Sequence, residues 1–368
     1  MSVSSTATPR ILVLYTELAP YVVACLRALV AELRADVHVV HWPVNKEAPF
    51  RLEMGEGVHR YDRSTTDDGA LLALARQLDP DLVLCSGWID KGYLKVCRKL
   101  RSGGAHTVMC SDTAWRGDLK QRVATVIGKA TLHGIFTHAW VTGERQRTYA
   151  LKLGFEPGVI RTGFYAADID RFLPLGRAAI ADRTRGWPHR FLCVARYIGV
   201  KNHQLLCDAF AELCHAGQAG DWELWFTGTG ELFDAVTNSP SGRHPRIKHL
   251  GFVQVDDMPD VLTDCGVFIL PSAYEPWGVV VQELACAGFP LALSSEVRAA
   301  ERFLSEGING MTFPAGDKEA LERTMRAFVD KSDAQLAAMG AKSIGTGAAW
   351  GPQAWVRTAA TMIPERNG

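Results

Sequence analysis

The segment at 271–288, PSAYEPWGVVVQELACAG, constrains the fold of this chain more than any other. The apolar run at 266–270 predicts a buried parallel strand, and residues 279–287 predict a helix that ends at Gly288. A strand, a short turn and a helix N-terminus form an anion site, because the first backbone N–H groups of a helix have no partner within it. The stretch therefore predicts an α/β domain with a phosphate-binding turn near residues 278–280.

Two carboxylates lie in this stretch, Glu275 in the turn and Glu283 in the helix. A bare phosphate would be repelled by them, whereas a phosphate joined to sugars would not, because carboxylates accept hydrogen bonds from pairs of hydroxyl groups. One carboxylate would then hold a hexose and the other a ribose. The plainer interpretation, in which Glu275 caps the helix and Glu283 is a solvated surface residue, fits the spacing as well.

The length of 368 residues is too great for one core and predicts two domains. Basic and acidic residues number 40 each, so charge does not suggest nucleic acid as a partner. The nine cysteines form no C-x-x-C pair, which favours a reducing, cytoplasmic location. The polar start MSVSSTATPR does not resemble a signal peptide, and no apolar run approaches the roughly 20 residues of a membrane-spanning helix.

The first half of the chain alternates short apolar runs with segments of helical periodicity. This pattern predicts a doubly wound parallel sheet. The predicted strands are 11–15, 37–41, 81–85 and 107–110. Because ligands of such sheets lie beyond the carboxyl ends of the strands, the loops at 17–21, 86–90 and 111–116 are predicted to border a binding site.

The Leu-Pro-Ser run followed by Glu275, seven residues and Glu283 resembles the signature of family 4 of the glycosyltransferases, within glycosyltransferase group 1. The resemblance implies a retaining enzyme that uses a nucleotide sugar. It also implies the GT-B fold, in which two Rossmann-like, doubly wound parallel-sheet domains face a cleft. The resemblance is strong over residues 190–360 and only an outline before them.

The turn ARYIGVKNH after the predicted strand at 191–195 resembles the Arg-x4-Lys segment of the same family, with Arg196 and Lys201 in the basic positions. A departing nucleoside diphosphate gains negative charge as the glycosidic bond breaks. Two cations at the carboxyl end of a strand would stabilise that charge without a metal. The alternative is a pair of exposed basic residues that flank a turn.

The family pattern also assigns the remaining donor contacts. Glu275 would hold sugar hydroxyls and Glu283 the ribose. The other predicted donor-binding residues are Gly228, Val253, Pro276, Trp277, Gly278 and Val279. The donor is expected to be a UDP-sugar or a GDP-sugar, with no cofactor and no metal. The triplet Asp168-Ile169-Asp170 does not follow a nucleotide-binding strand, so we reject it as a metal motif.

The boundaries follow from the proline and glycine positions and from the family. Residues 1–172 are predicted to form an acceptor-side domain and 173–188, with two prolines and two glycines, a linker. Residues 189–345 are predicted to form the nucleotide-sugar domain, and 346–368 a terminal helix that crosses back to the first domain.

Two loops of the first half depart from the family. The loop at 16–21 has no glycine pair, and Ser111-Asp112-Thr113 stands where a histidine is frequent. Asp112 is predicted either to act on the acceptor hydroxyl as a catalytic residue or to cap a helix.

Two basic stretches follow these loops, one from Lys91 to Arg101 and one from Leu119 to Phe136. Basic amphipathic helices can lie on anionic membranes, and lipid-linked acceptors are common in the family. We favour two ordinary surface helices, and leave peripheral contact with the inner face of the membrane open.

The sequence thus predicts transfer of a sugar to a glycan, a lipid-linked or another hydroxyl acceptor, in bacterial polysaccharide or glycoconjugate synthesis. The alternatives are a GT-B sugar-nucleotide epimerase or phosphorylase, and a non-catalytic nucleotide-sugar-binding partner protein.

Overall fold

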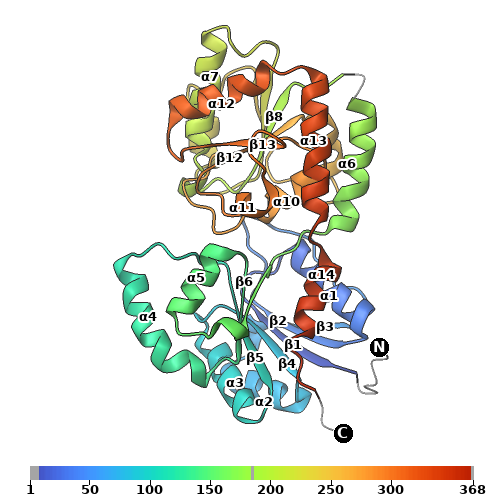
Figure 1. Ribbon diagram of the computed structural model, residues 1–368, viewed down its shortest axis with the longest axis vertical. Helices are drawn as coiled ribbons and strands as arrows, with labels where there is room; N and C mark the ends of the chain where they lie inside the picture. Colours follow the sequence, from blue (N-terminus) through green and yellow to red (C-terminus); the bar gives the residue numbers. More distant parts are fainter. Residues whose placement is uncertain (1–7, 184–185, 366–368) are drawn as a thin grey trace. The chain divides into compact units, whose positions relative to one another are not determined.

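Each of the two compact parts of the chain is built around its own parallel β-sheet (Figure 1). The computed structural model describes residues 8–183 and 186–365. The first unit comprises the described residues up to Val44, Leu52–Ala166 and the residues from Trp350 onward. The second comprises Asn45–Arg51 and Ala167–Ala349. The predicted fold class of two Rossmann-like, doubly wound parallel-sheet units is confirmed.

The first sheet has seven strands in the order β3-β2-β1-β4-β5-β6-β7, and they pair in parallel. The strands are β1 Arg10–Tyr15, β2 Asp36–His41, β3 Val58–Asp62, β4 Leu82–Ser86, β5 His106–Ser111, β6 His138–Val141 and β7 Ile160–Thr162. The central strands are apolar because both of their faces are buried. The predicted strands at 11–15, 37–41, 81–85 and 107–110 are β1, β2, β4 and β5, whereas β3, β6 and β7 are absent from the prediction. Edge strand β3, with the sequence VHRYD, buries only Val58.

Helices cover both faces of this sheet. They are α1 Pro20–Leu33, α2 Asp68–Leu78, α3 Lys91–Ser102, α4 Leu119–Thr131, α5 Glu144–Lys152 and α14 Pro352–Ala360. Alternate residues of β1 enter opposite cores: Ile11 and Val13 pack in one with Trp355 of α14, and Leu12 and Leu14 in the other with Leu71 of α2. This alternation is the period-two pattern of a strand that is buried on both faces.

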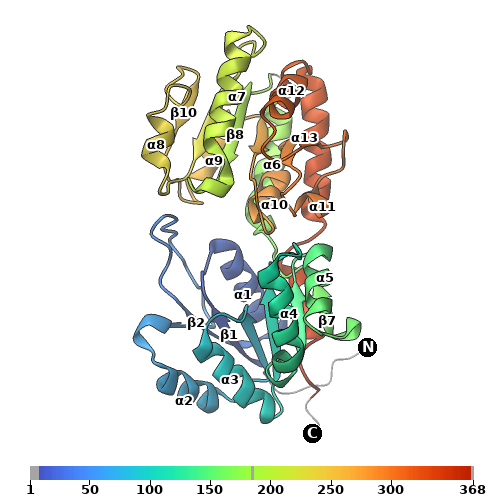
Figure 2. The ribbon, with the colours of Figure 1, turned by 90° about the vertical axis from the view of Figure 1, so that its left-hand side faces the viewer.

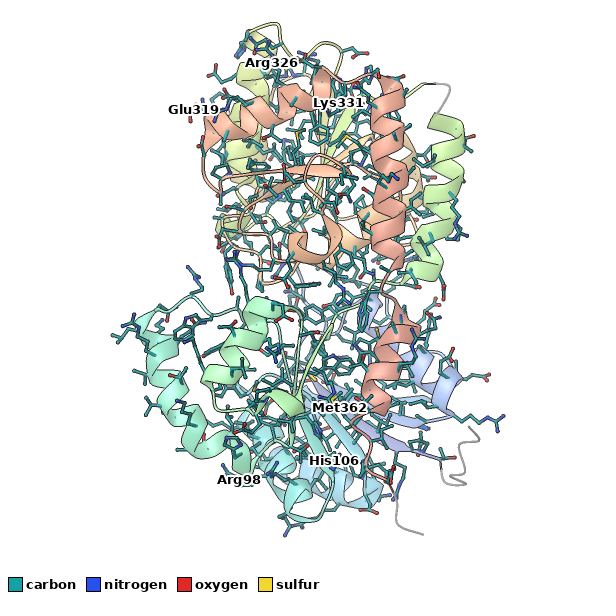
Figure 3. The ribbon with its side chains drawn as sticks, viewed as in Figure 1. Arg98, His106, Glu319, Arg326, Lys331 and Met362 are labelled. Atoms are coloured by element: carbon teal, nitrogen blue, oxygen red, sulfur yellow. The ribbon has the colours of Figure 1, made fainter. Side chains whose placement is uncertain are left out.

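The last helix of the chain belongs to the first unit, where α14 packs beside α1 (Figure 1). The Trp355 indole donates to the Phe164 backbone oxygen at 2.6 Å and lies 4.5 Å from the Trp140 ring. After the helix, the Met362 backbone oxygen lies 2.8 Å from Nδ1 of His106 (Figure 3). Residues far apart in the sequence therefore complete one core.

The second sheet has six parallel strands in the order β10-β9-β8-β11-β12-β13. The strands are β8 Arg190–Val194, β9 Glu223–Thr227, β10 Ile247–His249, β11 Val267–Leu270, β12 Leu291–Ser294 and β13 Gly310–Phe313. The helices are α6 Ile169–Arg183, α7 His203–His215, α8 Phe233–Thr237, α9 Met258–Asp264, α10 Val279–Cys286, α11 Ala300–Phe303, α12 Lys318–Val329 and α13 Asp333–Ala348.

The segment that we predicted as a linker, 173–188, lies largely in helix α6, and its residues 184–185 fall outside the described part of the chain. Gly176, which we interpreted as a linker residue, is instead a packing residue. A Cβ atom there would lie 2.1 Å from the Cys286 backbone oxygen. The glycine thus lets α6 approach α10, and both helices also pack against α13 (Figure 2). Close helix packing explains why a segment with proline and glycine is helical here.

None of the helices found over residues 8–183 and 186–365 combines the length and the apolar character that a membrane span requires.

Candidate functional site

The strand order of the second sheet places the predicted motifs at its topological switch point. Strands β9 and β10 lie on one side of β8, and β12 and β13 lie beyond β11 on the other. The loops that leave β8 and β11 therefore run in opposite directions. In open α/β sheets, ligands bind at the point where two such loops separate. The turn with Arg196 and Lys201 follows β8, and the turn with Glu275 follows β11.

These two turns are joined by hydrogen bonds. The Ala273 N–H donates to the Val200 oxygen at 2.8 Å, and the Asn202 side-chain amide donates to the Pro271 oxygen at 3.1 Å. Asn202 has a left-handed φ of 54°, a conformation that asparagine tolerates better than most residues. The Arg-x4-Lys turn and the Leu-Pro-Ser turn thus form one structure.

The Lys201 ammonium donates to a carboxylate oxygen of Glu275. The two side chains are only 14% and 10% exposed, so the ion pair is largely removed from water. The Ser272 hydroxyl lies 3.5 Å from the same carboxylate oxygen. The interpretation of Glu275 as a helix cap is wrong, because the N-cap of α10 is Gly278 and receives no side-chain cap.

Gly278 is required by the turn that leads into α10. Its φ is +91°, and a Cβ atom would lie 3.0 Å from Cγ of Glu275. A side chain would therefore be strained and would press on the ion pair. The helix begins at Val279, which is buried, and the neighbouring Pro276 is half-buried. The amino end of α10 thus lies beside the Lys201–Glu275 pair.

Arg196 faces a segment that the sequence analysis did not single out. Its guanidinium lies 3.6 Å from the Glu47 carboxylate, and the Thr229 hydroxyl donates to the Glu47 backbone oxygen at 2.9 Å. Further along the segment, the Phe50 ring meets the Phe252 ring edge-on at 5.3 Å. Residues Asn45–Arg51 therefore pack against the loops that follow β8, β9 and β10.

The loop after β9 approaches the loop after β8 closely. Gly228 has a φ of +127°, and a Cβ atom there would lie 2.1 Å from the Ala195 oxygen. Only glycine fits this contact. The Gly228 N–H donates to the Gly251 oxygen at 2.7 Å. This hydrogen bond joins the loop after β9 to the loop that carries the half-buried Val253. Gly228 and Val253 therefore lie in adjoining loops.

Glu283, in the second turn of α10, is half-buried and not the solvated residue of the plainer interpretation. Burial, with a smaller contribution from the Asp168 carboxylate, raises the pKa of Glu283 to about 7, although Arg171 opposes the shift. The carboxyl group thus changes charge near neutral pH.

Trp277 lies inside the second unit, with a side chain only 2% exposed and 6.3 Å from the Phe303 ring. Its indole nitrogen has no hydrogen-bond partner among the described residues. The Trp277 backbone oxygen accepts from the Ala299 N–H at 2.9 Å. Its indole therefore packs in the core, and the backbone fixes the turn.

Asp112 lies in the first unit, after the carboxyl end of β5. Its Oδ2 atom accepts a hydrogen bond from the Tyr165 hydroxyl at 3.2 Å. The helix-cap interpretation of Asp112 is wrong for the next helix, because Asp118 caps α4 through the Gln121 N–H. Burial, and then the Asp112 carboxylate, raise the pKa of Tyr165, which keeps this phenol a hydrogen-bond donor.

Known proteins resemble this chain in sequence and in fold. Residues 188–331 match the family model described as Glycosyl transferases group 1. The chain is 28% identical over 167 residues to the lipopolysaccharide core biosynthesis glycosyltransferase LpsE of Rhizobium meliloti, an alignment that covers 44% of this chain and 46% of that protein. It is 27% identical over 171 residues to mannosylfructose-phosphate synthase of Agrobacterium fabrum, which covers 43% of this chain and 37% of that protein. The alignments thus span less than half of these curated relatives.

Two solved structures share the fold over nearly their full length. Anabaena HepE in complex with UDP and glucose superimposes with a TM-score of 0.72 at 15% identity, over 96% of this chain and 99% of that one. Sucrose-phosphate synthase from Thermosynechococcus elongatus superimposes with a TM-score of 0.74 at 17% identity, over 97% and 98% of the two chains. Residues 188–331 of this chain are therefore similar to the glycosyl transferases group 1 family, and its two parallel-sheet units have the GT-B fold.

Proposed function

We propose that this protein transfers a sugar from a nucleoside-diphosphate sugar to a hydroxyl acceptor, with retention of anomeric configuration and without a metal. The observation that carries the proposal is the buried Lys201–Glu275 pair at the switch point, beside the amino end of α10. A cation, a helix N-terminus and a carboxylate in one place suit a ligand that is both a phosphate and a sugar.

The donor is a UDP-sugar in this proposal, with a GDP-sugar as the second choice. Support comes from Anabaena HepE, whose solved structures contain UDP, UDP with glucose, and UDP-glucose. Arg196 and Lys201 hold the two phosphates, together with the backbone N–H groups at Gly278 and Val279. Glu283 accepts hydrogen bonds from the ribose.

The other predicted contacts complete the donor site. Glu275 accepts hydrogen bonds from sugar hydroxyls, while Pro276 and the Trp277 backbone shape the turn around the sugar. Gly228 borders the nucleotide, and the backbone of Val253 contacts the base. These two loops adjoin each other and lie next to the Arg196 turn.

In the reaction, the bond between the anomeric carbon and the diphosphate oxygen breaks, and the acceptor oxygen forms its bond on the same face of the sugar. The electron pair of the broken bond passes to the diphosphate. Arg196 and Lys201 lower the barrier because they bind the extra negative charge more strongly in the transition state than in the ground state. The acceptor hydroxyl proton passes to the departing phosphate, and Asp112 is our proposed acceptor-side residue.

The donor is tested with a panel of UDP-, GDP-, ADP- and dTDP-sugars. Each is assayed for slow hydrolysis and for a rise in the unfolding temperature of the protein, and neither measurement needs the acceptor.

Arg196→Ala or Lys201→Ala is expected to lower turnover about 10²–10³-fold. The control is Arg323→Ala, which removes an exposed charge from α12. Unchanged turnover in both site variants would refute the assigned roles.

The products separate this function from its alternatives. A free nucleoside diphosphate with a new glycoside identifies a transferase, and an altered sugar nucleotide identifies an epimerase. Binding without turnover, with every donor and a broad acceptor set, identifies a non-catalytic nucleotide-sugar-binding protein.

The acceptor is proposed to be a glycan or lipid-linked sugar at the inner face of a bacterial membrane, reached through α4. This helix exposes four large apolar side chains, Leu119 (77%), Val123 (52%), Val126 (71%) and Ile127 (55%). It also carries Lys120, Arg122 and Lys129. The apolar residues of α3 are instead buried, apart from the half-buried Leu94, so α3 exposes no large apolar side chain. Helix α4 therefore carries the membrane contact in this proposal.

Vesicles with and without phosphatidylglycerol test the membrane contact. We expect binding to the anionic vesicles, weakened by salt and lost in Val126→Glu. Ile308→Glu, at an exposed apolar residue of the second unit, is the matched control. Equal binding of the two variants would exclude α4 as the contact.

A further inference from the structure

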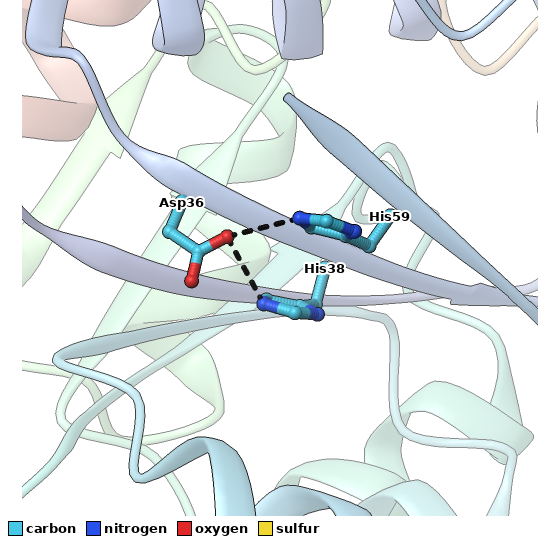
Figure 4. Close-up of side chains that lie close together, drawn as sticks. All are labelled: Asp36, His38 and His59. Carbon is cyan, nitrogen blue, oxygen red and sulfur yellow. Dashed lines mark ion pairs between the residues drawn. The ribbon is translucent and has the colours of Figure 1, made fainter. Parts of the chain in front are cut away.

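A cluster of three side chains of the types that bind metals lies in the first unit and includes none of the residues assigned above. It comprises Asp36 and His38 of β2 and His59 of β3 (Figure 4). His38 and His59 are register partners across the two parallel strands, and Asp36 precedes His38 by two residues. The period of two in a strand therefore places all three side chains on one face of the sheet.

The distances suit a single small cation. Oδ1 of Asp36 lies 3.1 Å from Nε2 of His38 and 3.3 Å from Nε2 of His59, and all three ligand atoms lie within 4.8 Å of one another. Bonds of about 2.0–2.2 Å in tetrahedral geometry separate zinc ligands by roughly 3.3 Å. Two of the three pairs already match that separation, and the His59 side chain is 56% exposed and can rotate to complete the third.

His38 is oriented in the manner of a metal ligand. Its ring is stacked on His59 at 4.6 Å, and its Nδ1 lies 3.0 Å from the Tyr61 hydroxyl. Its Nε2 is buried and makes no hydrogen bond with any described residue, although it faces the Asp36 carboxylate. An outer partner holds one ring nitrogen of a metal-bound histidine and leaves the other nitrogen for the ion. The Tyr61 hydroxyl lies where such a partner would lie, and Nε2 of His38 is left for the ion.

The cluster is separate from the predicted substrate side of the sheet. Asp36 is the first residue of β2 and pairs with Arg10, the first residue of β1, so the cluster lies toward the amino ends of the strands. Ligands of doubly wound sheets bind at the opposite, carboxyl ends. Strand β3 is the edge of the sheet, and an ion held from both strands would fasten that edge to β2.

We propose that Asp36, His38 and His59 bind one zinc ion, with water as the fourth ligand, and that this ion clasps edge strand β3 to β2. Two imidazoles and a carboxylate suit zinc rather than magnesium or calcium, which prefer oxygen ligands. The half-exposed Asp36 and the exposed His59 give the ion access from solvent. The inference does not depend on the proposed transferase activity.

The test uses the full chain without an affinity tag, treated with a chelator and kept reduced. Competition with a chromophoric chelator should show one equivalent of Zn²⁺ bound, and no competition by Mg²⁺. His59→Gln and Asp36→Asn should weaken binding by more than the roughly 10–100-fold that an outer partner contributes. Tyr61→Phe, which removes such a partner, should weaken it about tenfold.

Two controls sharpen the result. His133→Gln and His215→Gln remove exposed histidines elsewhere and should leave Zn²⁺ binding unchanged. Co²⁺ should give the visible bands of a four-coordinate site without thiolate charge-transfer bands, which excludes the nine free cysteines as ligands. Zn²⁺ should also raise the unfolding temperature of the wild type and not of His59→Gln. Absence of a stoichiometric site, or its survival in both His59→Gln and Asp36→Asn, would overturn the proposal.

Discussion

The Lys201–Glu275 pair couples the stability of the second unit to its proposed chemistry. Because both side chains are largely buried, removal of one leaves a charge without its partner. Glu275→Leu is expected to destabilise the protein by about 3–5 kcal/mol, measured by chemical denaturation. Lys201→Met combined with Glu275→Leu should recover most of that loss while remaining inactive, since an apolar pair carries no buried charge.

An exposed pair serves as the reference. Arg326 and Asp330 lie 3.6 Å apart at the end of α12, with side chains 53% and 65% exposed, and removal of either should cost only about 0.3–0.5 kcal/mol. Equal losses at the two pairs, or no recovery in the double variant, would mean that burial does not set the cost at Glu275.

Glu283 should give stability a distinct pH dependence. Its pKa rises from an ordinary value near 4.5 to about 7 in the folded protein, so the folded state binds its proton more tightly than the unfolded state. The stabilising contribution is therefore complete below pH 4.5 and is lost as pH rises through 7. Glu283→Gln should consequently gain stability relative to wild type between pH 5 and pH 8.

Denaturant midpoints of both proteins across that range measure the effect. Glu212→Gln, on the exposed side of α7, should show no such trend. A constant difference between Glu283→Gln and wild type from pH 5 to pH 8 would show that the Glu283 carboxyl does not titrate in this window.

Among the elements, the segment Asn45–Arg51 is the one that local sequence pattern did not connect to the site. Glu47 lies 3.6 Å from the Arg196 guanidinium, and the two side chains are 35% and 37% exposed. A diphosphate that binds Arg196 must compete with this carboxylate. Exposed pairs of this kind contribute about 0.2–1 kcal/mol, so Glu47→Gln should tighten UDP binding by up to about fivefold.

Calorimetric titration with UDP at low and high salt measures that change. The gain should shrink as salt screens the pair, and Glu212→Gln should leave the affinity unchanged. Weaker UDP binding in Glu47→Gln would instead show that Glu47 contacts the nucleotide directly and does not compete with it.

The sequence predicted those helices and strands whose pattern of apolar residues matches their burial in the structure. Apolar runs identified central strands such as β1 and β8, and the helix predicted at 279–287 is α10. The misses have physical causes. Edge strand β3 buries only Val58, so its sequence lacks the apolar run of a central strand. Helix α6 contains Gly176, whose role in helix packing is visible only in three dimensions.

The same distinction holds for the site. The turns that carry Lys201 and Glu275 adjoin each other in the structure, because they follow the neighbouring strands β8 and β11 at the switch point. The roles assigned to these residues from the motif spacing stay predictions. Glu47 lies 149 residues before Arg196 in the sequence, and no periodicity or spacing encodes the packing of an irregular segment against distant loops.

For the molecule as a whole, the two units should respond separately to changes at the end of the chain. Trp355 lies in the core of the first unit, where it is 3% exposed and its ring lies 4.5 Å from the Trp140 ring. Trp355→Ala should lower the stability of that unit by about 3–5 kcal/mol. Every residue proposed to bind the donor nucleotide lies in the second unit, so UDP affinity should be retained.

Scanning calorimetry with and without UDP distinguishes the two units, because a ligand raises the transition of the unit that binds it. Trp355→Ala should lower the temperature of only that unfolding transition which UDP does not raise. Arg357→Ala, exposed on the same helix, should change neither by more than about 0.5 kcal/mol. If Trp355→Ala lowered the UDP-responsive transition as strongly as the other, the units would unfold as one, and the terminal helix would support donor binding as well as the sheet on which it packs.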